Sequence, residues 1–232
     1  IGVAANCGSS LGLTAEISFS TSAIPAMLPY ATGFEAGEDA GWLFVNGGNA
    51  WITGSATSVN GSNALYVSND NGVSNSYTNS QSAISYAYRT ISIDAAGSYA
   101  VSFDWKSVGE SNYDYMRAWL APANFQFIAN LLPNGSTSTY SYTTTTPAGW
   151  YDLGGKMNLF DSWQNNHQVV SIAEAGNYNL VFMWCNDNSS GNNPPAAVDN
   201  VSIAALSCSA PTNLVATATA TEATIMWEAT GN

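Results

Sequence analysis

The chain alternates large apolar residues with small or polar ones over short stretches. In SYAVSFDWKS (98–107), every second residue is large and apolar: Tyr99, Val101, Phe103 and Trp105. On an extended chain these side chains share one face, and the polar residues take the other face. The pattern predicts a half-buried antiparallel strand.

A second stretch, NYNLVFMWCN (177–186), has the same spacing of aromatic residues, but Val181 and Met183 make its other face apolar as well. That composition predicts a central strand that is buried on both faces. Clusters of Gly, Asn, Ser and Pro separate the further predicted strands at 64–69, 113–122, 167–172 and 197–206. No segment longer than a turn or two has helical periodicity.

Residues 92–105 and 171–184 share the pattern S-I-x-x-A-G-x-Y-x-[VL]-x-F-x-W. Each copy predicts a strand, a glycine-containing turn at Gly97 or Gly176, and a returning strand whose aromatic residues enter the core. We interpret the copies as two comparable β-arches in the two sheets of a sandwich. Many short strands without helices indicate an all-β fold, a two-sheet antiparallel β-sandwich.

Composition supports a folded protein, because 46% of the 232 residues are apolar and 12% are aromatic. The chain has sixteen acidic residues and only four basic ones, and its formal net charge is −12. Such a surface repels nucleic-acid phosphates and anionic lipids, so neither is expected as a partner. Divalent cations are the natural counter-partners, although acidity can also serve only to keep a protein in solution.

No apolar run reaches the length of a membrane span, so membrane insertion is not expected. The chain begins without the basic and apolar regions of a signal peptide, and we interpret it as a mature extracytoplasmic protein. Its three cysteines are too few for a disulfide scaffold. Cys7 and Cys208 flank the main domain and could form a bridge, and Cys185 is expected to be a buried thiol.

We divide the chain into three parts. Residues 1–29 contain few aromatic residues and are expected to be a leader or linker. Residues 30–206 form the main β domain. Residues 207–232 contain a linker and two strand-like stretches, which are too short to bury a core and therefore indicate the truncated start of another β domain.

Four motifs carry a resemblance to a known family: LPYATGFEAGEDAGWLF (28–44), NGSNALYVSNDNG (60–72), SNYDYMRAWLAP (111–122) and FMWCNDNSSGNNPPAAVDNVSI (182–203). Together they resemble the cleaved-adhesin domains of gingipain-type bacterial proteins. These are also called choice-of-anchor J domains and are similar in fold to MAM domains. The resemblance covers residues 29–206 and implies a jelly-roll sandwich of the concanavalin or galactose-binding type. The tail from Pro211 resembles the first strands of a fibronectin type III module.

The chain departs from this family at two places. Cys185 stands where a basic residue is expected, which removes one partner for the many carboxylates. The stretch GWLFVNGGNAW (41–51) lacks the Asp-rich calcium loop that some gingipain adhesins carry there. A second metal site in that stretch is therefore not expected.

Asp199 lies in the predicted strand 197–206, where strict alternation puts it on the core face with Val201 and Ile203. A buried carboxylate needs a partner. The resemblance implies a structural Ca²⁺ beside the first and last strands, held by Glu35 and Asp199, with Asn63 or the carbonyl of Ser62 as a further ligand. Two alternatives remain: a turn capped through Asn200 and Asn193, or a salt bridge to Arg89 or Arg117.

The sequence has few residues for catalysis. The only histidine, His167, is expected to be a surface turn residue rather than a general base. Zinc sites of the usual spacing are absent, and a triad would depend on this one histidine. The best pair of carboxylates, Glu38 and Asp39, is adjacent, so the two side chains should diverge on an extended chain. We therefore predict a protein that is not an enzyme.

Binding is a better-supported function. Jelly-roll modules stack sugars on exposed aromatic rings, and this chain is rich in aromatic residues and in Asn. Trp150 and Tyr151 lie in a loop rich in Thr, Gly and Pro, and Tyr113 and Trp51 are weaker candidates. Each ring could instead cover a sheet edge.

We expect a secreted or surface-displayed bacterial adhesion or carbohydrate-binding module, stabilised by Ca²⁺ and part of a larger multidomain protein. Its partners would be a glycan or a host surface or matrix protein. A structural spacer that positions a neighbouring domain is the alternative. A hydrolase would require two carboxylates in a cleft.

Overall fold

The computed structural model describes residues 2–6, 11–16, 24–139, 144–206 and 212–228. Within these ranges the regular structure consists of β-strands, and no α-helix is present. Accordingly, the described part of the chain has no helix that is long and apolar enough to cross a bilayer. The prediction of an all-β fold is confirmed.

One of the two main sheets has five antiparallel strands. Its centre is β12, the strand predicted to be buried on both faces, and residues 180–186 of β12 are all buried. In spatial order the strands are β10 (Tyr151–Asp152), β9 (Tyr115–Pro122), β12 (Gly176–Asn186), β7 (Ala83–Ile93) and β4 (Trp42–Val45).

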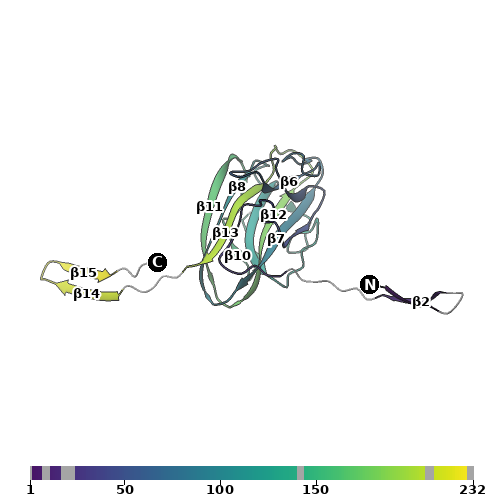
Figure 1. The fold of residues 1–232 in the computed structure, drawn as a ribbon. Coiled ribbons are helices and arrows are strands. Elements are labelled where there is room, and N and C mark those ends of the chain that lie inside the picture. Colours follow the sequence, from purple (N-terminus) through teal and green to yellow (C-terminus); the bar gives the residue numbers. More distant parts are fainter. Residues whose placement is uncertain (1, 7–10, 17–23, 140–143, 207–211, 229–232) are drawn as a thin grey trace.

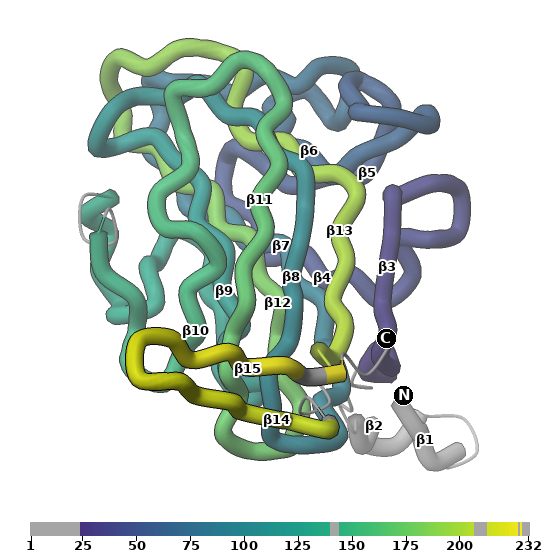
Figure 2. The backbone as a smooth tube through the Cα atoms, turned by 90° about the vertical axis from the view of Figure 1, so that its left-hand side faces the viewer, coloured from purple at the N-terminus to yellow at the C-terminus, as the bar shows by residue number. Residues whose placement is uncertain are grey.

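The other main sheet has six strands, in the order β11-β8-β13-β6-β5, and β3 also pairs with β13. Their bounds are β11 (Phe160–Ile172), β8 (Gly97–Ser107), β13 (Ala197–Ala205), β6 (Ala64–Ser68), β5 (Ala50–Gly54) and β3 (Tyr30–Thr32). In Figure 2, β11, β8 and β13 run side by side. From β7 to β9 and from β11 to β13, successive strands alternate between the sheets, as in a jelly roll.

The core lies between the inner faces of the sheets and is rich in aromatic side chains. The Phe182 ring lies at its centre, with centroids 5.1 Å from Phe103, 5.9 Å from Trp42 and 6.5 Å from Trp51. Tyr99, Val101, Phe103 and Trp105 are all buried in this cluster, as their alternation predicts.

The two sequence copies form adjacent arches between the sheets. The first leads from β7 in the five-stranded sheet to β8 in the six-stranded sheet. The second leads back, from β11 in the six-stranded sheet to β12 in the five-stranded sheet. They lie side by side, because Ile93 pairs with Gly176 and Gly97 pairs with Ile172. The interpretation of the repeat as two comparable arches is confirmed.

The outer face of the five-stranded sheet also carries an apolar cluster. Trp119 and Met183 are fully buried there, although they point away from the main core. The long connection between β9 and β10 covers this face with the rings of Phe127 and Trp150. This second cluster determines where aromatic side chains reach the surface.

The terminal parts form two hairpins, β1–β2 (Gly2–Asn6 and Leu11–Glu16) and β14–β15 (Thr212–Ala218 and Ala223–Glu228). Figure 1 shows them on opposite sides of the sandwich. The two C-terminal strands lie where the sequence predicted strand-like stretches, and the first hairpin lies within residues 1–29, the expected leader or linker. Cys7 and Cys208 lie outside the described residues, so their bridge stays a prediction. Cys185 is a free, buried thiol.

Candidate functional site

Asp199 is fully buried, but not for the reason that strict alternation suggests. A bulge between Asp199 and Ser202, where Asn200 has φ of 50°, adds one residue to β13. Before this bulge Asp199 pairs with Asp104, which lies on the outer face of the sheet. Beyond the bulge, Val201 and Ile203 point into the core. The expectation that Asp199 shares the core face with these two residues is therefore wrong.

Backbone amides from the loop between β5 and β6 and from β13 itself bind the Asp199 carboxylate. Its Oδ2 accepts a hydrogen bond from the Val59 amide at 2.9 Å, and its Oδ1 accepts one from the Asn200 amide at 2.7 Å. Burial raises the pKa of Asp199 above its ordinary value, and the amide hydrogen bonds oppose that rise. The hydrogen bond from the Asn200 amide confirms one part of the turn-capping alternative.

Neither arginine that the sequence offered is a partner of Asp199. Arg117 pairs with Asp152 at 3.1 Å, and Arg89 donates to the carbonyls of Ile24 and Gly41 at 2.8 and 3.3 Å. Asn193, which was also considered, accepts a hydrogen bond from the Tyr77 amide instead. The salt-bridge alternative is wrong because both guanidinium groups are engaged elsewhere.

Glu35, Ser62 and Asn63 meet on the same loop as Asp199. Glu35 Oε1 accepts hydrogen bonds from the amides of Ser62 at 2.8 Å and Asn63 at 3.0 Å. These hydrogen bonds lower the pKa of Glu35. The four predicted metal ligands therefore lie around one loop, and Ser62 and Asn63 contact Glu35 through their N–H groups rather than through oxygen.

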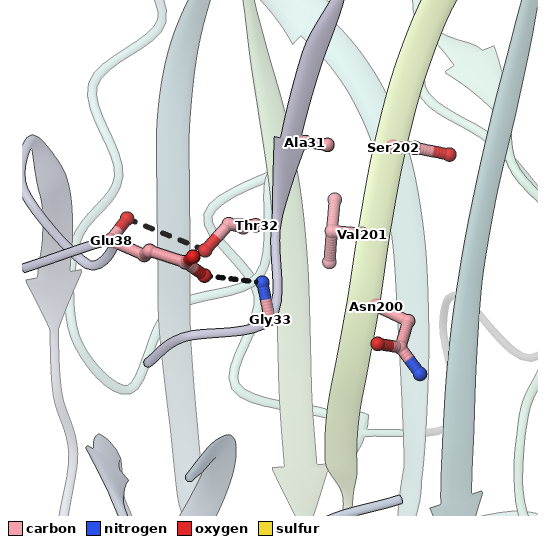
Figure 3. Close-up of a pocket in the computed structure, with 7 residues that line it drawn as sticks. All are labelled: Ala31, Thr32, Gly33, Glu38, Asn200, Val201 and Ser202. Carbon is pink, nitrogen blue, oxygen red and sulfur yellow. Dashed lines mark hydrogen bonds between the residues drawn. The ribbon is translucent and has the colours of Figure 1, made fainter. Parts of the chain in front are cut away.

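A pocket of about 290 Å³ opens beside Gly33, between β3 and β13. Figure 3 shows Thr32 and Gly33 on one side of it, Asn200 on the other, and the Glu38 carboxylate next to the Gly33 amide. An ideal Cβ built on Gly33 would lie 3.7 Å from Glu38 Oε2, 3.8 Å from Asp199 Oδ1 and 3.9 Å from Asn200 Oδ1. Three side-chain oxygens thus border the space in front of Gly33.

The type of donor in this set suits a hard cation, because Ca²⁺ binds carboxylate and amide oxygens in flexible geometry. Sequence reasoning missed Glu38 and Asn200 as members of the set. The signal for Glu38 is the glycine-rich turn GFEAGE, in which the Glu38 amide donates to the Glu35 carbonyl and the Glu38 carboxylate folds back onto the Gly33 amide. Glu38 and Asp39 do diverge as expected, since Asp39 accepts a hydrogen bond from the Thr53 hydroxyl.

A second acidic cluster contains Glu110, Asp114 and Asp187. One carboxylate oxygen from each lies within 4.8 Å of the others, a spacing at which a metal ion could be held. Asp114 is fully buried and accepts hydrogen bonds from the Tyr77 hydroxyl at 2.5 Å and the Asp187 amide at 3.0 Å. Burial raises the pKa of Asp114 to about 6, and the charges of Asp187 and Glu110 add to that rise.

Trp150 belongs to a cluster of aromatic rings at the surface of the five-stranded sheet. Its centroid is 4.9 Å from Phe125, 5.5 Å from Trp119 and 6.1 Å from Phe127. Tyr88 on β7 extends the cluster, 4.8 Å from Phe127. Tyr88, Phe125, Phe127 and Trp150, which we call the aromatic patch, are all partly exposed.

The sequence indicated only Trp150 of the aromatic patch. The stretch ANFQF (123–127) alternates Phe125 and Phe127 just after β9, and that alternation is the signal that could have revealed them. The other three predicted binding residues lie elsewhere. Tyr151 packs against Tyr178 at 6.0 Å, and Tyr113 is 39% exposed. Trp51 is only 1% exposed and donates to the Ser85 carbonyl, so its expected exposure is wrong.

Few of the described residues could support catalysis. His167 is exposed within β11, opposite Ser102, rather than at the start of a strand as the sequence suggested. Asp114 is fully buried and therefore cannot touch a substrate in this conformation. The acidic cluster is more suited to binding a cation than to acid–base catalysis.

No protein-family model matches the chain, and no curated protein matches it. Among solved structures, it is similar to the xylan-binding CBM22-1 domain of Xyn10C from Paenibacillus barcinonensis, with 13% identity and a TM-score of 0.44. That alignment covers 79% of this chain and 97% of the other. It is also similar to a cleaved adhesin domain of Lys-gingipain from Porphyromonas gingivalis, with 15% identity, coverage of 77% and 98%, and a TM-score of 0.42.

The carbohydrate-binding module TmCBM61, solved in complex with β-1,4-galactotriose, has 12% identity to the chain, coverage of 75% and 95%, and a TM-score of 0.41. These neighbours are carbohydrate-binding modules and an adhesin domain. At such identities and TM-scores the matches concern the fold and carry no functional argument. Membership in the cleaved-adhesin family stays a prediction.

Proposed function

We propose that the chain is a secreted or cell-surface, non-catalytic module that binds carbohydrate or mediates adhesion, as part of a larger multidomain protein. The observation that carries this proposal is the aromatic patch. Its four rings reach the surface from β7 and from the connection between β9 and β10. Aromatic rings that are partly exposed present apolar faces on which sugar rings can stack.

Polar groups suited to sugar hydroxyls lie close to the patch. Gln126 is exposed between Phe125 and Phe127 along the chain. Asp152 and Thr146 accept hydrogen bonds from the Arg117 guanidinium, which lies over the Trp119 ring at 5.0 Å. A surface that combines apolar rings with donors and acceptors matches the two kinds of contact that glycans make.

A calcium ion beside Gly33 is the second part of the proposal. Glu38, Asp199 and Asn200 each place a side-chain oxygen within 3.9 Å of the position that a Cβ on Gly33 would take. Glu35 holds the loop between β5 and β6 through the amides of Ser62 and Asn63. When bound, the ion would join the loop between β5 and β6 to β3 and β13. We assign it a role in stability rather than in ligand binding.

The structural-spacer alternative is favoured by one specific observation. The rings of the aromatic patch pack against one another at 4.8 to 6.1 Å, so they also serve to cover the sheet. A module whose only task is to position a neighbouring domain would use them for that purpose alone. Binding measurements separate the two functions.

Replacement of Trp150 by alanine is expected to weaken glycan binding by about 30-fold, because a central aromatic anchor typically contributes about 2 kcal/mol. The full chain would be screened on arrays of glycans and matrix proteins, and the affinity for the best ligand measured by calorimetry. Trp163 is the matched control, since it is partly buried on β11 in the other sheet, beneath the Lys106 ammonium at 5.3 Å.

The Trp163→Ala variant should keep the affinity of the wild type. Arrays without any bound glycan or matrix protein would support the spacer instead. Equal losses from the two tryptophan variants would show that the ligand does not bind at the aromatic patch.

A further inference from the structure

We propose that Glu110, Asp114 and Asp187 form a second cation site, which binds Ca²⁺ independently of the pocket beside Gly33. The site lies where the connection from β8 to β9 meets the connection from β12 to β13. The backbones of these connections are joined by a bridge between Gly109 and Asn192. The sequence alone does not reveal this site, because Glu110 and Asp114 are more than 70 residues from Asp187 along the chain.

The three carboxylates converge in space. One oxygen of each lies within 4.8 Å of the others. Two oxygens bound to the same Ca²⁺, at 2.3–2.6 Å each, are separated by at most about 5 Å, whereas two bound to Mg²⁺ are separated by at most about 4.2 Å. The observed spacing falls within the span that Ca²⁺ allows.

An unpartnered carboxylate oxygen provides independent support for a ligand. Glu110 Oε2 is buried from solvent and has no hydrogen-bond partner among the described residues. A buried anionic oxygen without a donor loses its hydration and gains nothing in exchange. A cation between the carboxylates would provide the missing interaction.

The local charge balance leads to the same inference. The salt bridge found among the described residues joins Arg117 to Asp152 and involves none of the three acids. The nearby Lys156 ammonium instead donates to the Ser111 carbonyl and to Asn112 Oδ1 at 3.3 Å. Three carboxylates at short range repel one another, and a divalent cation removes that repulsion.

The chemistry of the donors favours a hard cation. All three side chains offer oxygen, without histidine or cysteine. Hydrogen bonds from Tyr77 and the Asp187 amide orient Asp114, and each of its oxygens keeps a lone pair for a metal. The ligands lie on loops rather than on a rigid helix, which suits the irregular, six- to eight-oxygen geometry of Ca²⁺ better than the strict octahedron of Mg²⁺.

Calorimetric titration of the chelator-treated full chain with CaCl₂ tests the site. Glu110→Gln and Asp187→Asn are the informative variants, because both keep the size of the side chain and Asp187→Asn keeps the amide bonded to Asp114. Each should bind one fewer Ca²⁺ per chain than the wild type. The control is Glu174→Gln, which removes an exposed carboxylate between β11 and β12 and should change nothing.

Thermal melting provides a second measurement. With Ca²⁺ at about 100 times its Kd, one site should raise the Tm by about 5–10 °C, and Glu110→Gln should lose that increment. Circular dichroism would verify that the variants are folded. A wild-type stoichiometry retained in Glu110→Gln would overturn the proposal, as would tighter binding of Mg²⁺ than of Ca²⁺. A Ca²⁺ response that Asp199→Asn abolishes completely would show that only the pocket beside Gly33 binds the ion.

Discussion

Replacement of Asp199 by alanine is expected to lower the free energy of unfolding by about 2–5 kcal/mol. The carboxylate is fully buried and accepts hydrogen bonds from the amides of Val59 and Asn200. Each of these partly buried amides costs about 1–3 kcal/mol when it is left without an acceptor, and the loop between β5 and β6 would lose its attachment to β13. Chemical denaturation followed by tryptophan fluorescence measures this loss.

Asp199→Asn separates the hydrogen bonds from the charge. Asparagine keeps the shape and one acceptor oxygen, so it should restore part of the lost stability, yet it lacks the negative charge that a calcium ligand needs. We expect this variant to bind one fewer Ca²⁺ than the wild type. A loss below about 1 kcal/mol in Asp199→Ala would show that water replaces the carboxylate at the two amides.

Replacement of Gly191 by alanine should destabilise the protein by about 2–5 kcal/mol. Gly191 has φ of 79°, where a Cβ costs about 1–2 kcal/mol. A Cβ at this position would also overlap the Tyr77 hydroxyl and the Asp114 carboxylate. Such overpacking costs about 1–3 kcal/mol in addition. Urea denaturation of the variant measures the total.

Gly149→Ala is a closely matched control for this substitution. Gly149 has the same φ of 79°, but an ideal Cβ there has no atom within 4 Å. It should therefore show the backbone cost alone, about 1–2 kcal/mol. Equal losses in the two variants would mean that the connection carrying Gly191 moves away from Tyr77 and Asp114 without cost.

The strands and the two-sheet sandwich could be predicted because the relevant signal is local. Side chains alternate with a period of two in any strand, so Tyr99, Phe103 and Phe182 are recognisable as core residues from their spacing. The repeated pattern also indicated two arches. Their adjacency could not be predicted, since pairing of Ile93 with Gly176 joins residues far apart in the chain.

The candidate sites were less predictable than the fold. Alternation assigned Asp199 to the core face together with Val201. The bulge at Asn200 adds one residue to the strand, so Asp199 before it and Val201 after it point to opposite faces, whereas alternation predicts the same face for both. The hydrogen-bond partner of Asp199 could not be read from spacing either, because Val59 approaches it only after β6 and β13 have paired. Trp51 was wrongly expected at the surface for the same reason.

The sequence by itself determined the β class, the strand pattern, the acidic character of the surface and the aromatic content of the core. These follow from composition and from side-chain periodicity, which act along the chain. Only the tertiary structure decided that the Asp199 carboxylate is held by amides, that Glu110, Asp114 and Asp187 converge, and that Tyr88 joins Trp150 in the aromatic patch. Each of these depends on segments distant in sequence, which only the packing of two sheets and their connections brings into contact.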